Sequence, residues 1–402
     1  LLGRVLTSCV EEVAEIPVKE LAANADFWLK VRSDYVLKPE YINLESGYYN
    51  IIPTPTLNSM ISYAKMVNKE GSYYMRTVQW DNKKRVAQKL AELVGCTAKN
   101  VIITRNTTES LDLVIKGFSW KKGDEAIFAK QDYGAMKIMF EQVAKRSGIV
   151  NKIISVPNHP ASDEEIVGIY ENAITSKTKL LMVCHMINIT GHILPIKKIC
   201  QMAHSKGVQV MVDGAHCLGH FEYKIEDLEC DYYGSSLHKW LAAPLGTGML
   251  YVKDEHIDSL WPIFAEHHRE DGDITRLNHI GTHPVHHDLT IESAIDYYNM
   301  LGGARKEARL RFLQEYWSSQ VRSHPNIVVN TPKESHKACG IANVGIKSMK
   351  PSVLAKRLME EYKVFTVAID YANVKGCRIS PNVFTTTKEL DVFVNALKEM
   401  AA

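Results

Sequence analysis

One lysine and one aspartate stand in local sequences that suit covalent chemistry with an aldehyde. Lys239 lies in the segment Gly234-Ser235-Ser236-Leu237-His238-Lys239-Trp240, and Asp213 follows the apolar run Val208–Val212. A lysine amine forms a Schiff base with a carbonyl group, and a carboxylate at a strand end can pair with a protonated ring nitrogen. This pair of residues is what a pyridoxal phosphate enzyme needs, because the carboxylate keeps the ring protonated and able to accept electrons.

A group of small polar residues between a predicted strand and a predicted helix suits a phosphate. The run Val101–Arg105 leads into Asn106, Thr107 and Thr108, and an apolar helical pattern follows. Such a junction offers backbone N–H groups, hydroxyl donors and the positive end of a helix dipole. The alternative is an ordinary helix N-cap. Beside the lysine and the aspartate, we interpret the junction as the binding site for the cofactor's phosphate.

Three further polar side chains follow predicted strands and could contact the cofactor ring. His216, just after Asp213, could donate to the phenolic oxygen of the ring. Tyr133 could stack on the ring or carry a proton, and Asn188 could bind the ring oxygen or the substrate. The alternatives are a loop tyrosine packed on a neighbour and an asparagine in a turn.

An arginine near the C-terminus is the candidate for binding a substrate carboxylate. Arg378 lies in Gly376-Cys377-Arg378-Ile379-Ser380-Pro381, and a planar guanidinium binds a carboxylate through two parallel hydrogen bonds. The alternative is a salt bridge between domains. We expect substrate specificity to come from Tyr48 and its neighbours, from the segment 73–76 and from loops of a partner subunit.

Short apolar runs alternate with amphipathic stretches from about residue 85, which predicts strands alternating with helices. The predicted strands are 101–103, 126–128, 153–156, 180–183, 208–212 and 249–252; the predicted helices are 84–93, 110–115, 134–146, 163–173 and 196–204. This order is typical of an α/β fold with a buried, mostly parallel sheet flanked by helices. Ligands bind such sheets at the carboxyl ends of the strands.

The pattern changes after residue 288 and predicts a small α+β domain. A long helix is expected from 291 to about 321, with a possible break at Gly302-Gly303. Strands are expected at 327–329, 341–346, 364–368 and 377–380, and helices at 351–362 and 387–400. We therefore divide the chain into an N-terminal segment (1–44) that packs on the small domain, a large cofactor-binding domain (45–290) and the small domain (291–402).

Composition excludes several classes of function. The 402 residues carry a formal net charge of +2, so there is no broad basic field to hold nucleic acid. No apolar run reaches the length of a membrane span. The eight cysteines are scattered without a CxxC pair, which indicates a reducing compartment and a cytoplasmic protein, although export of a longer precursor is compatible with the sequence. The histidines at 267, 268, 279, 283, 286 and 287 lack regular metal-ligand spacing, so we expect no metal.

These motifs together resemble the class V aminotransferase family of fold type I pyridoxal phosphate enzymes, and within it the isopenicillin N epimerase-like group. The matching segments are Val212–His216, Ser236–Trp240, Ala243–Gly248, Gly281-Thr282 and Arg378–Pro381. The resemblance implies that Ser236 and His238 join Thr107 and Thr108 in binding the phosphate. It also implies a homodimer with shared active sites, in which Thr282 reaches the phosphate of the neighbouring subunit.

The expected chemistry begins with removal of the α-proton of an amino acid or amino-acid-like substrate by Lys239. Reprotonation on the ring carbon gives transamination, reprotonation of Cα from the opposite face gives epimerisation with Tyr133 as the second acid, and loss of a β-substituent gives a C–S lyase. Cysteine desulfurase activity is a weaker alternative, because Cys339 lacks the Ser/Gly-rich context that related desulfurases carry. A silent scaffold or a nucleotide enzyme is disfavoured, because the lysine, aspartate and phosphate segment are all present and no glycine-rich nucleotide motif follows a strand.

Overall fold

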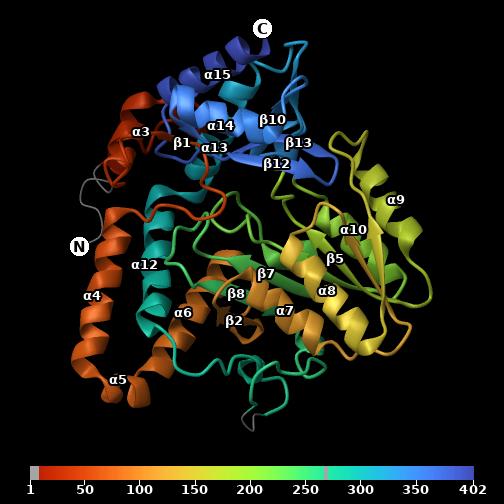
Figure 1. Ribbon diagram of the computed structural model, residues 1–402. Helices are drawn as coiled ribbons and strands as arrows, with labels where there is room; N and C mark the ends of the chain where they lie inside the picture. Colours follow the sequence, from red (N-terminus) through yellow and green to blue (C-terminus); the bar gives the residue numbers. More distant parts are fainter. Residues whose placement is uncertain (1–8, 267–269) are drawn as a thin grey trace.

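The computed structural model describes residues 9–266 and 270–402. A large domain is built on a seven-stranded sheet, and a smaller domain holds a four-stranded sheet. Figure 1 shows the small domain above the large one, with the first helices of the chain beside it. His267, His268 and the first eight residues of the N-terminal segment lie outside the described residues.

The large sheet has the strand order β2-β8-β7-β6-β5-β3-β4. Its strands are β2 (Val101–Thr104), β3 (Glu125–Ala129), β4 (Val150–Ile154), β5 (Thr178–Cys184), β6 (Gln209–Asp213), β7 (Tyr232–Ser236) and β8 (Gly248–Val252). Neighbours from β7 to β4 pair in parallel, whereas β8 runs antiparallel to both β2 and β7. The predicted mostly parallel sheet of an α/β fold is confirmed.

Helices cover both faces of this sheet, and alternate residues of each strand serve the two faces. On β3, Ala126 and Phe128 belong to one hydrophobic cluster, and Ile127 and Ala129 belong to the other. The helices on the Phe128 face are α7 (Thr107–Gly117) and α8 (Gly134–Ser147), and those on the opposite face are α6 (Gln79–Val94), α9 (Asp163–Ala173) and α10 (Ile196–Ser205). Because both faces are buried, these strands read as continuous apolar runs.

Two details of the predicted sheet are wrong for physical reasons. β7 was not predicted, because Tyr232-Tyr233-Gly234-Ser235-Ser236 has no aliphatic run, although all five residues are buried. The strand expected at 153–156 is β4, Val150–Ile154. β4 is an edge strand with exposed Val150 and Ile153, so its apolar pattern is weak.

The long helix expected from 291 to 321 is two helices, α12 (Val285–Leu301) and α13 (Gly303–Ser318). Gly302 between them has φ +90°, a backbone conformation that favours glycine. The break at Gly302-Gly303 is therefore confirmed. α12 packs against α4 (Thr54–Glu70) and α6 of the large domain, and α13 packs against α2 (Val18–Ala23) and α15 (Thr387–Ala401).

The small domain has an antiparallel sheet in the order β12-β13-β10-β9. Its elements are β9 (Ile327–Val329), β10 (Ala342–Ile346), α14 (Pro351–Tyr362), β11 (Val364–Phe365), β12 (Val367–Tyr371), β13 (Val374–Ile379) and α15 (Thr387–Ala401). The strand expected at 364–368 is divided into β11 and β12, because β11 lies outside this sheet and pairs in parallel with β1 (Ile42–Asn43). A capping box of Thr386 and Glu389 begins α15.

The N-terminal part of the chain contributes α2 (Val18–Ala23), α3 (Ala25–Arg32), β1 (Ile42–Asn43), α4 (Thr54–Glu70) and α5 (Ser72–Thr77). The short elements of the large domain are α11 (Ile225–Leu228), η1 (Ala98–Asn100), η2 (Asp254–His256) and η3 (Ile274–Leu277), and η4 (Ser335–Lys337) lies in the small domain. Arg32 binds Glu389 of α15 through two hydrogen bonds of 2.8 Å. Among the described helices, none is both long and apolar enough to span a membrane.

Candidate active site

A cavity of about 330 Å³ lies where the carboxyl ends of β5, β6 and β7 meet the small domain. This volume is within the usual range of about 300–1,000 Å³ for small-molecule sites. The predicted site residues that line it are Tyr48, Asn106, Thr107, Thr108, Tyr133, Asn188, Asp213, His216, Ser236, His238, Lys239 and Arg378. Residues from seven separate stretches of the chain thus converge on one cavity.

Lys239 follows β7 in the turn that leads to β8, and its amine is enclosed by the cavity wall. Burial lowers the pKa of Lys239 to about 8, although the charge of Asp213 opposes this effect. The Nζ atom lies 3.1 Å from Nε2 of His216. Burial also lowers the pKa of His216 well below its ordinary value, so this imidazole is neutral at physiological pH. The lysine amine is therefore easier to deprotonate than a surface lysine.

Asp213 is the last residue of β6, and its carboxylate is buried beside the cavity. Oδ1 accepts a hydrogen bond of 3.0 Å from the backbone N–H of Ala215. No described residue donates a hydrogen bond to Oδ2 or pairs with this carboxylate, and burial raises the pKa of Asp213. The next residue, Gly214, packs so closely on Tyr233 that an added Cβ would lie 2.1 Å from its ring. A buried carboxylate with a free oxygen is suited to a cationic ring nitrogen.

The residues predicted to bind the cofactor's phosphate lie at the N-terminus of α7. Asn106 is the N-cap residue, and its Oδ1 accepts from the N–H of Glu109 at 2.9 Å. Thr107 and Ser236 are joined through their hydroxyls at 2.7 Å, and the N–H of Thr107 donates to the Ser236 hydroxyl at 3.0 Å. β8 approaches this turn closely, because Gly248 lacks a Cβ that would lie 2.6 Å from Asn106. The helix N-terminus and two hydroxyls therefore face one end of the cavity.

Arg378 on β13 reaches the cavity, but it is already engaged by a residue that the sequence did not indicate. Its Nε donates to Oε2 of Glu45 at 3.1 Å, its Nη2 binds Oε1 of Glu45, and its Nη1 donates to the backbone oxygen of Asn188 at 3.3 Å. The side chains of Arg378 and Glu45 are 8% and 4% exposed. A guanidinium has five N–H groups, so two are left for a further acceptor.

The other predicted residues differ in how far they enter the cavity. Asn188 is semi-buried, and its Oδ1 has no hydrogen-bond partner among the described residues. Tyr133 and Tyr48 lie at the cavity lining with 46% and 76% exposure. Thr282 is exposed in the loop before α12 and does not line this cavity. Within one chain, Thr282 therefore has no role at this site.

The cysteines of the described chain are all unpaired, and seven of the eight are buried. Cys339 is fully buried in the core beside α13, and burial raises its pKa to about 12. Cys184 borders the cavity, but burial raises its pKa well above the ordinary value. Neither thiol has the exposure and lowered pKa of a nucleophilic cysteine.

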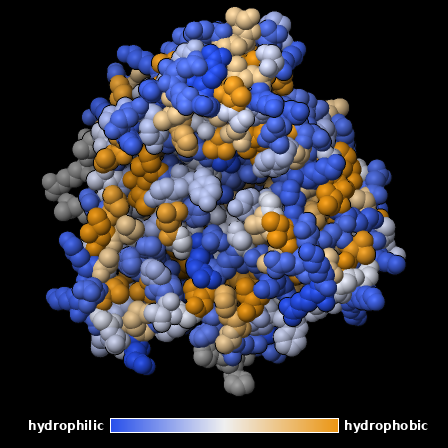
Figure 2. Space-filling model, viewed as in Figure 1, coloured by the Kyte–Doolittle hydropathy of each residue, from blue (hydrophilic) through white to orange (hydrophobic). Residues whose placement is uncertain are grey.

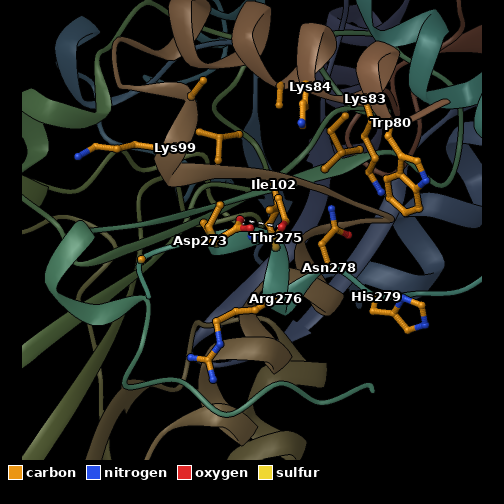
Figure 3. Close-up of a pocket in the computed structure, with 16 residues that line it drawn as sticks. Trp80, Lys83, Lys84, Lys99, Ile102, Asp273, Thr275, Arg276, Asn278 and His279 are labelled. Atoms are coloured by element: carbon orange, nitrogen blue, oxygen red, sulfur yellow. Dashed lines mark hydrogen bonds between the residues drawn. The ribbon is translucent and has the colours of Figure 1, made fainter. Parts of the chain in front are cut away.

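A second cavity of about 400 Å³ lies between α6 and the loop of residues 272–279. Figure 3 shows Trp80 and Lys83 extending side by side from α6 towards this loop. Burial lowers the pKa of Lys83, while Lys99 and Arg276 are tied to carboxylates of Asp254 and Glu266. This cavity does not touch the strand ends that carry Lys239 and Asp213, so we assign the candidate site to the first cavity.

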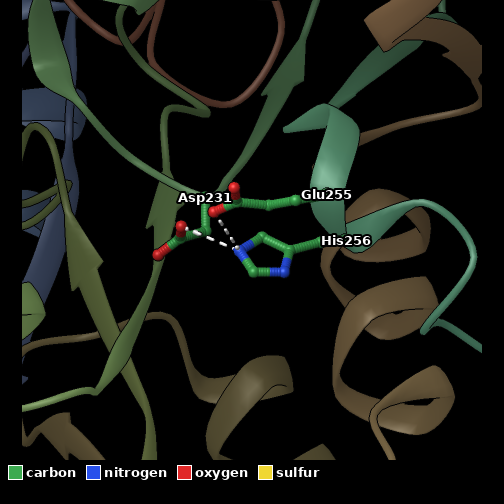
Figure 4. A group of neighbouring side chains, drawn as sticks. All are labelled: Asp231, Glu255 and His256. Carbon is green, nitrogen blue, oxygen red and sulfur yellow. Dashed lines mark hydrogen bonds and ion pairs between the residues drawn. The ribbon is translucent and has the colours of Figure 1, made fainter.

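One group of ligand-type side chains among the described residues has the spacing to hold a metal ion: Asp231, Glu255 and His256. In Figure 4 both carboxylates face Nε2 of His256. The two oxygens of Asp231 also have protein partners, since Oδ1 lies 3.0 Å from His256 Nε2, and Oδ2 accepts from the N–H of Val210 at 2.7 Å and lies 2.8 Å from His204 Nε2. Through these contacts Asp231, directly before β7, connects β6 with η2.

Comparison with known proteins identifies relatives along nearly the whole chain. A family model described as "Aminotransferase class-V" matches residues 51–393. The chain is 25% identical to isopenicillin N epimerase of Streptomyces clavuligerus over 92% of this chain and 97% of the epimerase. It is 27% identical to a probable cysteine desulfurase of Synechocystis sp. over 92% of this chain and 94% of that protein.

Solved structures give the same fold. A structure of a C-DES mutant with glycine covalently linked to the PLP cofactor has a TM-score of 0.82 at 20% identity, covering 91% of this chain and 98% of that chain. A complex of the cystine C–S lyase C-DES with cysteine persulfide has a TM-score of 0.80 at 20% identity, covering 89% and 97%. At this identity the likeness concerns the fold.

Proposed function

The chain belongs to the class V aminotransferase family, a family of pyridoxal phosphate-dependent enzymes, and we propose that it acts at the Cα of an amino acid or amino-acid-like substrate. The observation that carries this proposal is the meeting of Lys239, Asp213 and the hydroxyl-rich start of α7 around one cavity. The reaction is an amino transfer or an isopenicillin N epimerase-like inversion. The second candidate is β-elimination by a C–S lyase.

The residues of the cavity fit pyridoxal phosphate at each of its polar groups. The free oxygen of Asp213 would pair with the ring nitrogen, and His216 and Asn188 would bind the ring oxygen. Thr107, Thr108, Ser236 and His238 would bind the phosphate, with Asn106 fixing the turn and Tyr133 facing the ring. The free Oδ2 of the buried Asp213 carboxylate supports this assignment, because buried polar groups are rarely left without partners.

Bound there, pyridoxal phosphate supplies an aldehyde that takes up an amine and a ring that withdraws electrons from the substrate Cα. Lys239 acts as the nucleophile and then as the base for the α-proton, since burial favours its neutral form. Asp213 holds a negative charge opposite the ring nitrogen. Arg378 binds the substrate carboxylate with the two N–H groups that Glu45 and Asn188 leave free.

The burial of Cys339 disfavours cysteine desulfurase chemistry. A desulfurase needs a thiol that can reach the substrate sulfur, and Cys339 lies in the core with a raised pKa. Tyr133, half exposed at the cavity, is our candidate for the second acid that an epimerase needs. If Tyr133 does not deliver a proton, reprotonation elsewhere leads to transamination, and a leaving group on Cβ leads to elimination.

Absorption spectroscopy tests the cofactor. Purified protein is expected to show a visible absorption band that borohydride removes, and mass spectrometry should then find the cofactor on Lys239. Lys239→Ala should lack the band, while Lys84→Ala, a change of an exposed lysine on α6, should keep it. A colourless wild-type protein that takes up no added pyridoxal phosphate would refute the proposal.

A second experiment separates the reactions. The enzyme is incubated in deuterated water with L- and D-amino acids and small peptides, and α-proton exchange is followed by NMR. Inversion at Cα identifies an epimerase, appearance of a keto acid with an acceptor present identifies an aminotransferase, and release of a thiol or sulfide with a keto acid identifies a lyase. Tyr133→Phe should abolish inversion but keep exchange from the face that Lys239 serves.

We also propose a homodimer with active sites at the subunit interface, in a reducing compartment, the cytoplasm. Hydrophobic side chains are exposed on α5, on α6 and after η2, namely Tyr73, Trp80 and Trp261. Figure 2 shows apolar side chains mixed with polar ones on the α4 side of the molecule. The cavity of Figure 3 adjoins the loop that leads to Thr282. Unpaired cysteines support the compartment.

Complementation tests the shared site. Thr282→Asp and Lys239→Ala should each be inactive, and mixing them after mild dissociation should restore activity, because one site of the mixed dimer has both native residues. Sedimentation should give twice the 45.4 kDa of one chain. A monomer, or a mixture that stays inactive although mixed dimers form, would refute the shared site.

A further inference from the structure

Trp240, next to Lys239, makes contacts that the proposed chemistry has not used. Its indole is fully buried, and Nε1 donates a hydrogen bond of 3.4 Å to Nδ1 of His216. The other nitrogen of His216, Nε2, lies 3.1 Å from Nζ of Lys239. A continuous chain of contacts therefore runs from the indole through the imidazole to the lysine amine.

The chemistry of these groups decides where the protons lie. An indole N–H can only donate, so Nδ1 of His216 must accept and carries no proton. A neutral imidazole then carries its proton on Nε2, and this N–H points at the amine of Lys239. The amine must accept with its lone pair, which only uncharged lysine has. In the opposite arrangement, an ammonium donating to Nε2, the Nδ1–H of His216 would face the indole N–H.

A second histidine and a second lysine hold Trp240 in place. The ring of His220 stacks on the indole, with centroids 3.7 Å apart and planes 19° from parallel. Nε2 of His220 accepts from the N–H of Gly340 at 2.8 Å, so its Nδ1 carries the proton and donates to the backbone oxygen of His216 at 2.7 Å. Lys306, buried beneath the turn, donates to the backbone oxygen of Trp240.

We infer that Trp240 is a positioning residue that fixes the Nε2–H tautomer of His216, so that His216 donates to Lys239 and favours the uncharged, nucleophilic form of its amine. The inference rests on the proposed Schiff-base role of Lys239. His220 and Lys306 support the role of Trp240, because they fix its indole ring and its backbone. The same Nε2–H of His216 is the donor that can bind a ring oxygen of the cofactor.

The tautomer of His216 can be measured directly by ¹⁵N NMR of the full chain labelled at histidine, in the cofactor-free form and as isolated. His216→Gln identifies the His216 signals among the 16 histidines. In the cofactor-free wild-type protein at pH 9, above the pKa of Lys239 and where its amine is uncharged, Nε2 should carry the proton and Nδ1 should not. In Trp240→Phe, which keeps a ring but loses the N–H, His216 should become a mixture of tautomers or take up a proton.

The control is Trp317→Phe. Trp317 is also fully buried, but it lies in the core of the small domain. Its indole N–H has no hydrogen-bond partner among the described residues. This variant should leave the His216 signals unchanged. A wild-type His216 protonated on Nδ1 or on both nitrogens would overturn the inference even if Trp240→Phe does not fold. An unchanged tautomer in a folded Trp240→Phe would also overturn it.

The rate at which cofactor-free protein takes up pyridoxal phosphate is the second readout. Trp240→Phe should slow uptake about tenfold at neutral pH, as expected if the pKa of Lys239 rises by about one unit. Lys306→Met should also slow the uptake of pyridoxal phosphate. If wild-type protein takes up no cofactor, the proposed function fails while the tautomer measurement still stands, so the two failures are distinguishable.

Discussion

Glu45 and Arg378 form a buried ion pair whose strength can be tested by substitution. The side chains are 4% and 8% exposed, and Glu45 also accepts from the N–H of Tyr48 at 2.9 Å and from the hydroxyl of Ser380 at 3.1 Å. Glu45→Gln keeps the size of the side chain but removes its charge. The guanidinium of Arg378 is then a buried cation without a counter-charge.

The expected loss of stability is about 3–5 kcal/mol, the usual cost of removing one partner of a buried pair. With a urea m-value on the order of 3 kcal/mol per molar, this loss corresponds to a fall of about 1–1.7 M in the unfolding midpoint. The midpoint is followed by tryptophan fluorescence, because Trp317 lies in the core of the small domain that carries Arg378. Glu361→Gln is the control, since Glu361 pairs with Arg357 on the exposed face of α14, and its midpoint should not move.

A double-mutant cycle and a ligand separate charge from packing. Glu45→Gln with Arg378→Gln should cost clearly less than the sum of the single changes, because no charge is left uncompensated. Acetate should raise the melting temperature of Glu45→Gln more than that of the wild type, since a carboxylate can bind the guanidinium N–H groups of Arg378 that Glu45 has released. Two results would refute this reasoning: a wild-type midpoint in Glu45→Gln, or additive single and double changes.

Four further predictions concern the site. Asp213→Asn should slow α-proton exchange about 10²–10³-fold, the effect of losing one preorganised electrostatic group, and an unchanged exchange rate would contradict the ring-nitrogen assignment. Because burial lowers the pKa of Lys239 to about 8 and only the neutral amine attacks, stopped-flow absorbance should show cofactor uptake rising with pH up to about 8 and levelling above it; a rate that is flat from pH 6 to 9 would oppose this. Thr107→Val should weaken cofactor binding about 10–100-fold in fluorescence titration, as for one hydrogen bond to a charged group, and unaltered affinity would remove the phosphate role. Cys339→Ser should leave the rate of α-proton exchange unchanged. A loss of activity in this variant would support cysteine desulfurase chemistry instead.

Much of the fold was predictable, because local sequence patterns encode it. Buried strands of a parallel sheet are apolar on both faces, so β2, β3, β5 and β6 could be recognised from short runs alone. Gly302 marked the division between α12 and α13 through its backbone freedom. β7 was missed, because tyrosine, glycine and serine fill a fully buried strand whose glycine packs on α7. The helices α4 and α5 were also not predicted, since exposed Ile61 and Tyr73 weaken the amphipathic pattern.

The candidate site divides in the same way. Lys239, Asp213 and the residues at the start of α7 could be found, because each follows a strand and has a side chain with distinctive chemistry. Glu45 could not be found as the partner of Arg378, since the two residues are far apart in the chain. They are joined only because Glu45, after β1, pairs with Ser380, after β13.

The sequence by itself determined the alternation of most strands and helices, the lysine and the carboxylate, because these depend on periodicity and on residue type. Only the tertiary structure decided which hydrogen-bond donors of Arg378 are free. It also buried Cys339 in the core and placed Trp240 against His216, beside the lysine amine. The physical reason is that hydrogen bonding and burial depend on distances between residues that are remote in the chain, and no local pattern records those distances.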